Sequence, residues 1–285
     1  MAPTIGLVVK PDAAARQHAD ALEQWLQAKG CAVVRVASDA SPLSDARPGQ
    51  NPPPKDLAFV VVLGGDGTFL SAVRWLGDHQ VPLLGIKFGE LGFLAEAGEE
   101  QINSAVEMVL NNQYSTRPRM RLEVEVWQDQ NRVAGETVLN DVVINKGALA
   151  RLALIKTFVN DRYLTDYRAD GLIVATPTGS TAYSLSAGGP IMHPHVPGIL
   201  ITPICPFTLT NRPMIVPDTA QIKIQLTEKS ADIMLTFDGQ VGLPIDEHHV
   251  ITVRKAASPV QLITLPGRSF FDVLRTKLKW GGSRP

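Results

Sequence analysis

The chain has 285 residues, and its 27 lysine and arginine residues nearly balance its 28 aspartate and glutamate residues. This balance argues against a general affinity for nucleic acid or anionic membranes. The length is enough for two domains or one large one, and a hydrophobic content of 45% makes a sizeable core available. The amino-terminal residues lack the pattern of a signal peptide, and no segment approaches the ~20 apolar residues of a membrane helix. Because the two cysteines, Cys31 and Cys205, make no disulfide framework, we expect a cytoplasmic protein.

The first third of the chain alternates between short apolar runs and amphipathic stretches. This order predicts a parallel sheet with helices on its faces. The predicted strands are Thr4–Val9, Ala32–Val36, Leu57–Leu63 and Val81–Ile86. The predicted helices follow Asp12 (inward face Ala15, Ala19, Leu22 and Leu26), follow Asp66 up to about Gly77, and cover Glu99–Asn111. Residues Ser38–Pro54 are rich in proline and predict a loop, and whether that loop closes over a site is left open.

The run Leu63-Gly64-Gly65-Asp66-Gly67-Thr68 lies where a buried strand passes into a helix. Glycines there permit positive φ angles and a close approach by a ligand. The helix start offers N–H groups to a phosphate, so a carboxylate at this point suggests metal binding or proton transfer. The alternative is an ordinary turn with an aspartate near the helix N-cap.

This hexapeptide is neither a Walker A loop, because no Lys-Ser or Lys-Thr follows, nor a dinucleotide fingerprint, because the third glycine is missing. It resembles the Gly-Gly-Asp-Gly turn of a kinase superfamily that includes NAD kinases, diacylglycerol and sphingosine kinases and, more distantly, phosphofructokinases. The resemblance implies phosphoryl transfer without choosing the acceptor. A second glycine-spaced loop, 87–94, follows the next predicted strand, where it is either functional or a plain turn.

From about Tyr114 the pattern changes to alternating apolar and polar residues, which is typical of half-buried strands. We predict strands at 122–127, 136–145, 152–159, 171–176, 199–204, 221–226, 233–237, 250–254 and 261–265. A last amphipathic stretch, Phe270–Trp280, predicts a helix with Phe271, Leu274 and Leu278 on one face. The predicted fold is therefore a Rossmann-like α/β domain (1–113, with 270–285 packing back on it) and a β-sandwich-like domain (114–269).

Residues 168–190 combine a charged entry, a strand and a long stretch rich in glycine, serine and threonine. Such a stretch offers hydrogen-bond donors and one aromatic face for a sugar phosphate and a base, although it also fits a long turn. As a string it is similar to the signature of bacterial ATP-NAD kinases. The family's other elements occur in order: the Asp66 turn, Asn140-Asp141, and Phe237-Asp238-Gly239-Gln240. The resemblance spans nearly the whole chain.

The resemblance implies transfer of the γ-phosphoryl group of ATP to the 2′-hydroxyl of the adenosine ribose of NAD, which yields NADP. It implies that Asp66 is the catalytic base and that the Gly64–Thr68 turn (Gly64, Gly65, Gly67 and Thr68) binds phosphate. The implied NAD contacts are Asp66, Gly67, Asn140, Asp141, Arg151, Arg168, Asp170, Thr181, Ala182, Tyr183, Ser184, Leu185, Ser186 and Gln240. It further implies a homodimer or homotetramer, and an arginine at 168 is associated with preference for NAD over NADH.

Several finer roles follow as expectations. Asp170 would orient the substrate or Arg168, and Tyr183 would stack on adenine. Asn140 is alternatively a simple turn residue at a strand end. The cation is expected to be Mg²⁺ carried by ATP, without a tight protein site. The histidine pairs 193/195 and 248/249 suggest zinc only weakly, because neither has nearby cysteines or the spacing of a zinc site.

Two other functions share part of this pattern. A lipid kinase would contain the same Asp66 turn, but the balanced charge and the 168–190 string do not fit that family. A non-catalytic NAD or NADP sensor would keep the binding residues and would not need Asp66. The sequence does not distinguish ATP from polyphosphate as donor, and it does not reveal feedback by NADP or NADPH.

Overall fold

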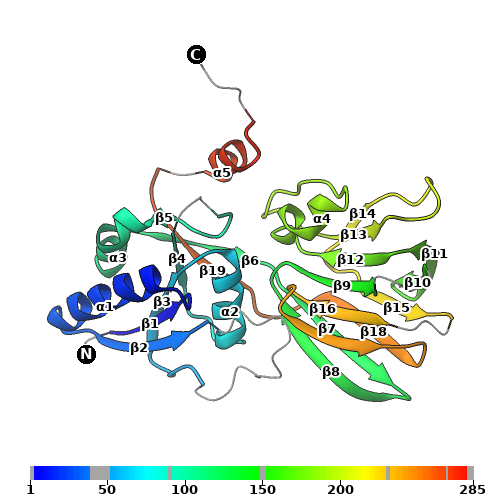
Figure 1. Ribbon diagram of the computed structural model, residues 1–285, viewed down its shortest axis with the longest axis horizontal. Helices are drawn as coiled ribbons and strands as arrows, with labels where there is room; N and C mark the ends of the chain where they lie inside the picture. The colour runs from blue at the N-terminus through cyan, green and yellow to red at the C-terminus, as the bar shows by residue number, and fades with distance from the viewer. Residues whose placement is uncertain are drawn as a thin grey trace. The chain divides into compact units, whose positions relative to one another are not determined.

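The computed structural model describes residues 3–38, 52–88, 92–147, 152–228, 232–267 and 269–280 (Figure 1). These residues divide into two compact units. Unit 2 consists of residues 119–259, and unit 1 consists of the described residues before and after them. The predicted class, an α/β domain joined to a β-sandwich domain, is confirmed.

Unit 1 is built on one sheet with the strand order β2-β1-β3-β4-β19-β6, and β5 also pairs with β4. The pairs β1–β2, β1–β3, β3–β4 and β4–β19 are parallel. Its strands are β1 (Thr4–Val9), β2 (Ala32–Ala37), β3 (Leu57–Leu63), β4 (Leu83–Lys87), β5 (Ala97–Gly98), β6 (Ser115–Arg119) and β19 (Val260–Thr264). Chain order reverses between β1 and β3, and in such sheets ligands bind beyond the carboxyl ends of the strands at this point.

The helices of unit 1 cover both faces of the sheet. They are α1 (Ala13–Ala28), α2 (Asp66–Leu76) and α3 (Ile102–Leu110), the last preceded by the 3₁₀ turn η1 (Glu99–Gln101). The Asp12 carboxylate caps α1 by accepting from the Ala15 N–H at 2.8 Å, and α1 buries the four residues predicted from its spacing. One sheet face packs against α1 and α3. Gly6, on the opposite face, lies against Trp75 of α2.

Unit 2 contains two six-stranded sheets with the orders β11-β10-β15-β18-β7-β8 and β14-β13-β12-β9-β16-β17. The first contains β7 (Leu122–Gln128), β8 (Asn131–Val138), β10 (Ala153–Val159), β11 (Arg162–Ala169), β15 (Ile222–Leu226) and β18 (His249–Lys255). The second contains β9 (Asp141–Lys146), β12 (Gly171–Ala175), β13 (Gly198–Ile204), β14 (Met214–Pro217), β16 (Ile233–Phe237) and β17 (Val241–Ile245).

One apolar core joins the two sheets of unit 2, with contributions from both. The outer face of the second sheet is also buried, by a cluster that includes Ile173, Leu200 and Met192. Residues after β12 form the 3₁₀ turn η2 (Gly179–Thr181) and the short helix α4 (Tyr183–Ser186). Burial on both faces explains why β12 and β13 read as continuous apolar runs rather than as alternating ones.

Two predicted strands differ from those observed, and some observed strands were not predicted. The run predicted as one strand over 136–145 is two strands, β8 and β9, separated by a turn at Leu139-Asn140. The strand predicted at 261–265 was assigned to the second half, but β19 pairs with β4 in unit 1. Strand β11 was missed, because its polar sequence carries little apolar alternation.

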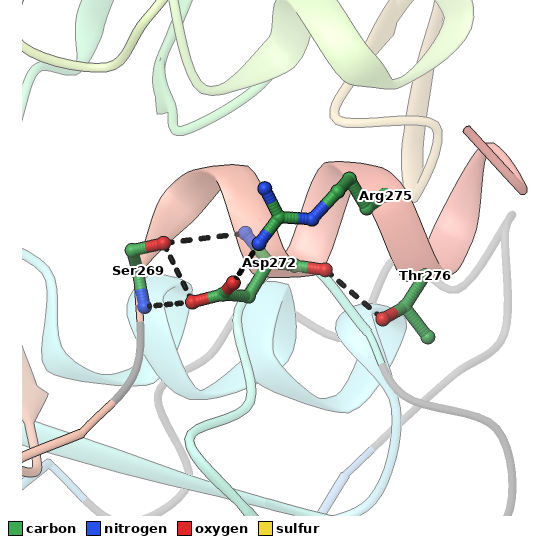
Figure 2. A network of polar contacts seen from close by, with 4 residues as sticks. All are labelled: Ser269, Asp272, Arg275 and Thr276. Atoms are coloured by element: carbon green, nitrogen blue, oxygen red, sulfur yellow. Dashed lines mark hydrogen bonds and ion pairs between the residues drawn. The ribbon is translucent and has the colours of Figure 1, made fainter. Parts of the chain in front are cut away.

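The last helix, α5 (Phe270–Lys277), belongs to unit 1. Figure 2 shows its amino-terminal capping box, in which Ser269 and Asp272 exchange hydrogen bonds and Arg275 pairs with Asp272. These hydrogen bonds, those with Ser269 first, lower the pKa of Asp272. Val273 and Leu274 are buried, whereas Phe271, predicted to share one face with Leu274, is exposed. None of the helices in the described ranges is long and apolar enough to cross a membrane.

Candidate active site

In unit 1, Asp66 is the first residue of α2 and follows the carboxyl end of β3 after Gly64 and Gly65. Its two carboxylate oxygens accept the backbone N–H groups of Phe93 and Leu94, each at 3.2 Å. A Cβ added to Gly92 would lie 2.3 Å from Asp66 Oδ1, so glycine is needed there for the carboxylate to approach the loop. Each oxygen retains a further lone pair for a substrate. The second glycine-spaced loop therefore positions Asp66, and of that loop residues 89–91 lie outside the described residues.

The glycines of the Asp66 turn do not adopt the positive φ angles that glycine permits. Among the described residues, the glycines with positive φ are Gly30, Gly77, Gly188, Gly239 and Gly267, and none belongs to the Gly64–Thr68 turn. Gly64 is required for space instead, because its Cβ would lie 2.4 Å from the Thr68 hydroxyl oxygen. Gly65 is the N-cap of α2 in an extended conformation with open space around it, and no side chain caps this helix. Asp66 therefore lies next to the N-cap, as the turn alternative has it, but its side chain does not cap the helix.

In unit 2, Asn140 and Asp141 lie at the start of β9, between the carboxyl ends of β12 and β16. The Asp238 carboxylate accepts the N–H groups of Leu139, Asn140 and Asp141 at 2.8, 2.7 and 3.1 Å. On the β12 side, the Thr176 hydroxyl donates to the Leu139 carbonyl at 2.6 Å, and the Thr176 N–H donates to the Asn140 carbonyl at 2.8 Å. The turn is thus held from both neighbouring strands.

Asp141 is almost completely buried. Burial, and next the negative charge of Asp238, raise the pKa of Asp141 to about 7. Its carboxyl group can therefore exchange a proton near neutral pH. Asn140 is half-buried, so part of its side chain is accessible to a ligand.

The stretch from Thr176 to Ser186 also lies at this end of the second sheet. Gly179 packs so closely that its Cβ would lie 2.1 Å from the Asn140 carbonyl oxygen. The Ser184 hydroxyl is buried and shares a 2.9 Å hydrogen bond with Thr202, so it is used within the fold. Tyr183 is 42% exposed, and Thr181, Ala182, Leu185 and Ser186 are half-buried or exposed. Gln240 follows β16 in the same region.

Asp170 lies at the opposite end of β12, and Arg168 lies two residues earlier, in β11 of the first sheet. Strand pairing places Gly171 beside Asn145 and Ala175 beside Asp141. At ~3.4 Å per residue, Asp170 and Asp141 are therefore about 17 Å apart along the strands. Asp170 forms an ion pair with Lys146 at 3.3 Å, rather than with Arg168, and the Arg168 guanidinium lies 5.0 Å from the centre of the Phe207 ring.

Some predicted positions lie outside the described residues, namely Arg151 and most of the Ser38–Pro54 loop. Within the described ranges, no three His, Cys, Asp or Glu side chains are grouped as a metal site. The His193 and His195 rings lie 5.1 Å apart in an edge contact, and His249 Nδ1 bonds to Asp246 at 2.7 Å. The zinc alternative therefore gains no support from either histidine pair.

Three residues that organise these sites were not among the predicted site residues: Gly92, Thr176 and Asp238. Gly92 and Asp238 stood inside motifs that had been noted, and Thr176 ended a predicted strand. Their partners are distant in sequence, 27 residues for Asp66 with Phe93 and 98 for Asp238 with Asn140. A single sequence offers no local signal for such contacts.

Comparison with known proteins identifies the family. Two family models match the chain, the ATP-NAD kinase N-terminal domain over residues 5–114 and the ATP-NAD kinase C-terminal domain over residues 139–265. The chain belongs to the NAD kinase family. It is 51% identical to an NAD kinase of Desulfatibacillum aliphaticivorans, over 98% of this chain and 99% of that protein. It is 47% identical to an NAD kinase of Geotalea daltonii, over 92% of this chain and 93% of that protein.

Solved structures of NAD(H) kinases share the fold. A yeast NADH kinase complexed with NADH superimposes with a TM-score of 0.84 at 28% identity, covering 100% of this chain and 90% of that one. An NAD kinase from Archaeoglobus fulgidus in complex with ATP gives a TM-score of 0.73 at 23% identity, covering 98% and 100%. The second similarity shows the fold alone.

Proposed function

We propose that this chain catalyses the reaction of its family, the ATP-dependent phosphorylation of NAD to NADP, with Asp66 as the general base. The observation that carries the assignment of Asp66 is its position: a half-buried carboxylate at the carboxyl end of β3, oriented by the Phe93 and Leu94 N–H groups. A sensor that only bound the dinucleotide would not need this carboxylate.

Phosphoryl transfer requires positioning and charge neutralisation more than covalent chemistry. The ribose 2′-hydroxyl is a poor nucleophile, and a carboxylate within hydrogen-bond reach accepts its proton as the attack proceeds, which contributes ~10²–10⁴-fold. The N-cap residue of α2 is Gly65, which has no side chain to cap the helix, and Thr68 lies in the first turn. A helix start of this kind suits the phosphates of ATP. We assign Gly64, Gly65, Gly67 and Thr68 to this role.

We assign NAD binding chiefly to unit 2. Asn140, Asp141, Gln240 and the residues from Thr181 to Ser186 gather at one end of the second sheet, where backbone contacts hold their turns. The exposed Tyr183 ring is available to stack on a base. The Ser184 hydroxyl is engaged with Thr202, so its contribution is to the shape of the turn. Asp170, at the other end of β12, and Arg168, in β11, are assigned to a different part of the dinucleotide, and Arg151 completes the set.

The remaining assignments concern the setting of the reaction. The divalent cation enters as MgATP, since Mg²⁺ keeps several waters and binds chiefly through substrate phosphates. We place the enzyme in the cytoplasm and expect a homodimer or homotetramer. EDTA should abolish activity and added Mg²⁺ alone should restore it. Light scattering of the purified protein gives the mass of the oligomer.

The decisive experiment mixes purified protein with NAD, ATP and Mg²⁺ and detects NADP with an NADP-specific dehydrogenase. NADP formation supports the reaction. Binding of NAD without turnover would favour the sensor, and phosphorylation of a lipid acceptor instead would favour the lipid kinase. Parallel reactions with NADH and with polyphosphate determine the acceptor preference and the donor. If Arg168 favours the oxidised form, NAD should be the better acceptor.

A further inference from the structure

Asp238 occupies a tight hairpin turn between β16 and β17. Asp238 and Gly239 both have positive φ, 50° and 62°, and the Gln240 N–H donates to the Phe237 carbonyl at 2.9 Å. Asp-Gly is a common pair for such a turn, because both central residues must adopt this conformation. The turn alone would account for an aspartate here, without any wider role.

The carboxylate of Asp238 reaches beyond its own hairpin. It accepts three consecutive backbone N–H groups, from Leu139 to Asp141, at 2.7–3.1 Å. The Asp238 N–H in turn donates to the Asp141 carbonyl at 2.9 Å. Three N–H donors on one carboxylate are charge-assisted hydrogen bonds, which are stronger than bonds between neutral groups. Turn formation does not require any of them.

The other edge of the Leu139–Asp141 turn is held by the chain that follows β12. Thr176 bonds to the carbonyls of Leu139 and Asn140, and its hydroxyl oxygen also accepts the Gly179 N–H at 3.0 Å. Thr176 is fully buried, so these bonds are protected from water. Together with Asp238, they engage the N–H and carbonyl groups of all three turn residues. The backbone is thereby fixed, with the Asp141 side chain buried and the Asn140 side chain partly accessible to a ligand.

We propose that Asp238 is a positioning residue for NAD: its carboxylate, with the Thr176 hydroxyl opposite, holds the Leu139–Asp141 turn so that Asn140 and Asp141 meet the dinucleotide in one orientation. This inference rests on the proposed role of those two residues in NAD binding. It assigns Asp238 no contact with the reacting atoms.

The test is Asp238→Asn, which keeps the size of the side chain and tolerates positive φ. The amide turns one acceptor oxygen into an N–H₂ donor that faces a backbone N–H. Loss of hydrogen bonds to a charged group corresponds to a rise of about 10- to 100-fold in the Kd and KM for NAD. The KM for ATP and the kcat should change less than about threefold, because those contacts are assigned to unit 1. If Asp238 had a purely structural role, the substitution would lower stability but would not change the KM for NAD and the KM for ATP differently.

The matched control is Asp161→Asn. Asp161 is also an aspartate in a hairpin turn of unit 2, with φ of 60°, but it is exposed. The Asp161→Asn substitution should leave the KM for NAD and the KM for ATP unchanged. Equal NAD affinity in wild type and Asp238→Asn would overturn the proposal, as would a parallel loss for NAD and ATP. If Asp238→Asn does not fold, Thr176→Val provides the same comparison: raised KM for NAD alone supports the inference, and unchanged KM overturns it.

Calorimetric titration with NAD alone separates this inference from the proposed reaction. Wild-type protein that binds NAD without producing NADP would contradict the reaction but still allow the affinity comparison. A direct structural readout is hydrogen exchange at the amides of Leu139, Asn140 and Asp141. We expect exchange there to be faster in Asp238→Asn than in the Asp161→Asn control, while the amides of β1 and β3 remain as in wild type.

Discussion

Asp66 in unit 1 and Asp141 in unit 2 are both aspartates that begin an element, but their surroundings differ. Asp66 is half-buried at a helix start, and two backbone N–H groups donate to its carboxylate. Asp141 is buried beside a second carboxylate, and its pKa is raised to about 7. Similar positions at the start of a strand and of a helix therefore yield different chemistry. Donors surround the aspartate assigned to proton transfer, and a like charge lies near the one assigned to binding.

The largest effect is expected from Asp66→Asn. The amide cannot accept the 2′-hydroxyl proton, so kcat should fall by roughly 10²–10⁴. NAD affinity, measured by calorimetry, should remain within a few-fold. Asp12→Asn is the control, because asparagine also caps a helix and α1 should persist. Near-normal kcat with a large loss of NAD affinity would show that Asp66 binds rather than accepts a proton.

The second prediction concerns the buried charge of Asp141. Its folded pKa of about 7 exceeds its ordinary 3.8, so the folded state binds the extra proton between these values. Its contribution to stability therefore falls as pH rises from about 4 to 7, by about 1.4 kcal/mol per pH unit and about 4 kcal/mol at most. Urea unfolding at a series of pH values, with Asp141→Asn as reference, measures this. A constant difference between the two proteins at pH 5 and pH 8 would contradict the raised pKa.

The third prediction returns to unit 1 with Gly92→Ala. The new methyl group would lie 2.3 Å from Asp66 Oδ1, so the carboxylate must move. A displacement of about 1 Å can cost ~10²-fold in rate, and kcat should fall by that order. Gly30→Ala is the control. Gly30 has a φ of 83° and open space around it, so the substitution should lower stability without affecting the site. Equal kcat values in the two variants would show that the 87–94 loop does not set the position of Asp66.

The smallest effect is expected from Ser184→Ala in unit 2. It leaves the fully buried Thr202 hydroxyl without its 2.9 Å partner, so the free energy of unfolding should fall by about 1–3 kcal/mol. The exposed Ser186→Ala should change it by less than about 0.5 kcal/mol. Thermal unfolding of both variants measures the difference. If Ser184→Ala is as stable as Ser186→Ala, the hydroxyl pair does not anchor the turn after β12.

Sequence reasoning succeeded where the determinants are local. The Asp12 cap and the spacing of Ala15, Ala19, Leu22 and Leu26 predicted α1 correctly, and the apolar run before Gly64 predicted β3, since each signal lies within one element. It failed where a distant segment decides the outcome. The break at Leu139-Asn140 depends on hydrogen bonds from Asp238 and Thr176, which are distant in sequence. Similarly, the membership of β19 in the first sheet depends on pairing with β4, far away in sequence.

The position of β19 in the sheet bears on biosynthesis. Residues 119–259 are synthesised after β4 but before β19. While a ribosome makes them, the nascent amino-terminal sheet lacks the strand that will pair with β4. An unpaired strand edge is a template for aggregation or for pairing with another chain. We therefore expect nascent chains stalled before residue 260 to depend on chaperones or to aggregate. Chains that extend beyond residue 264 can pair β19 with β4 and so cover this edge.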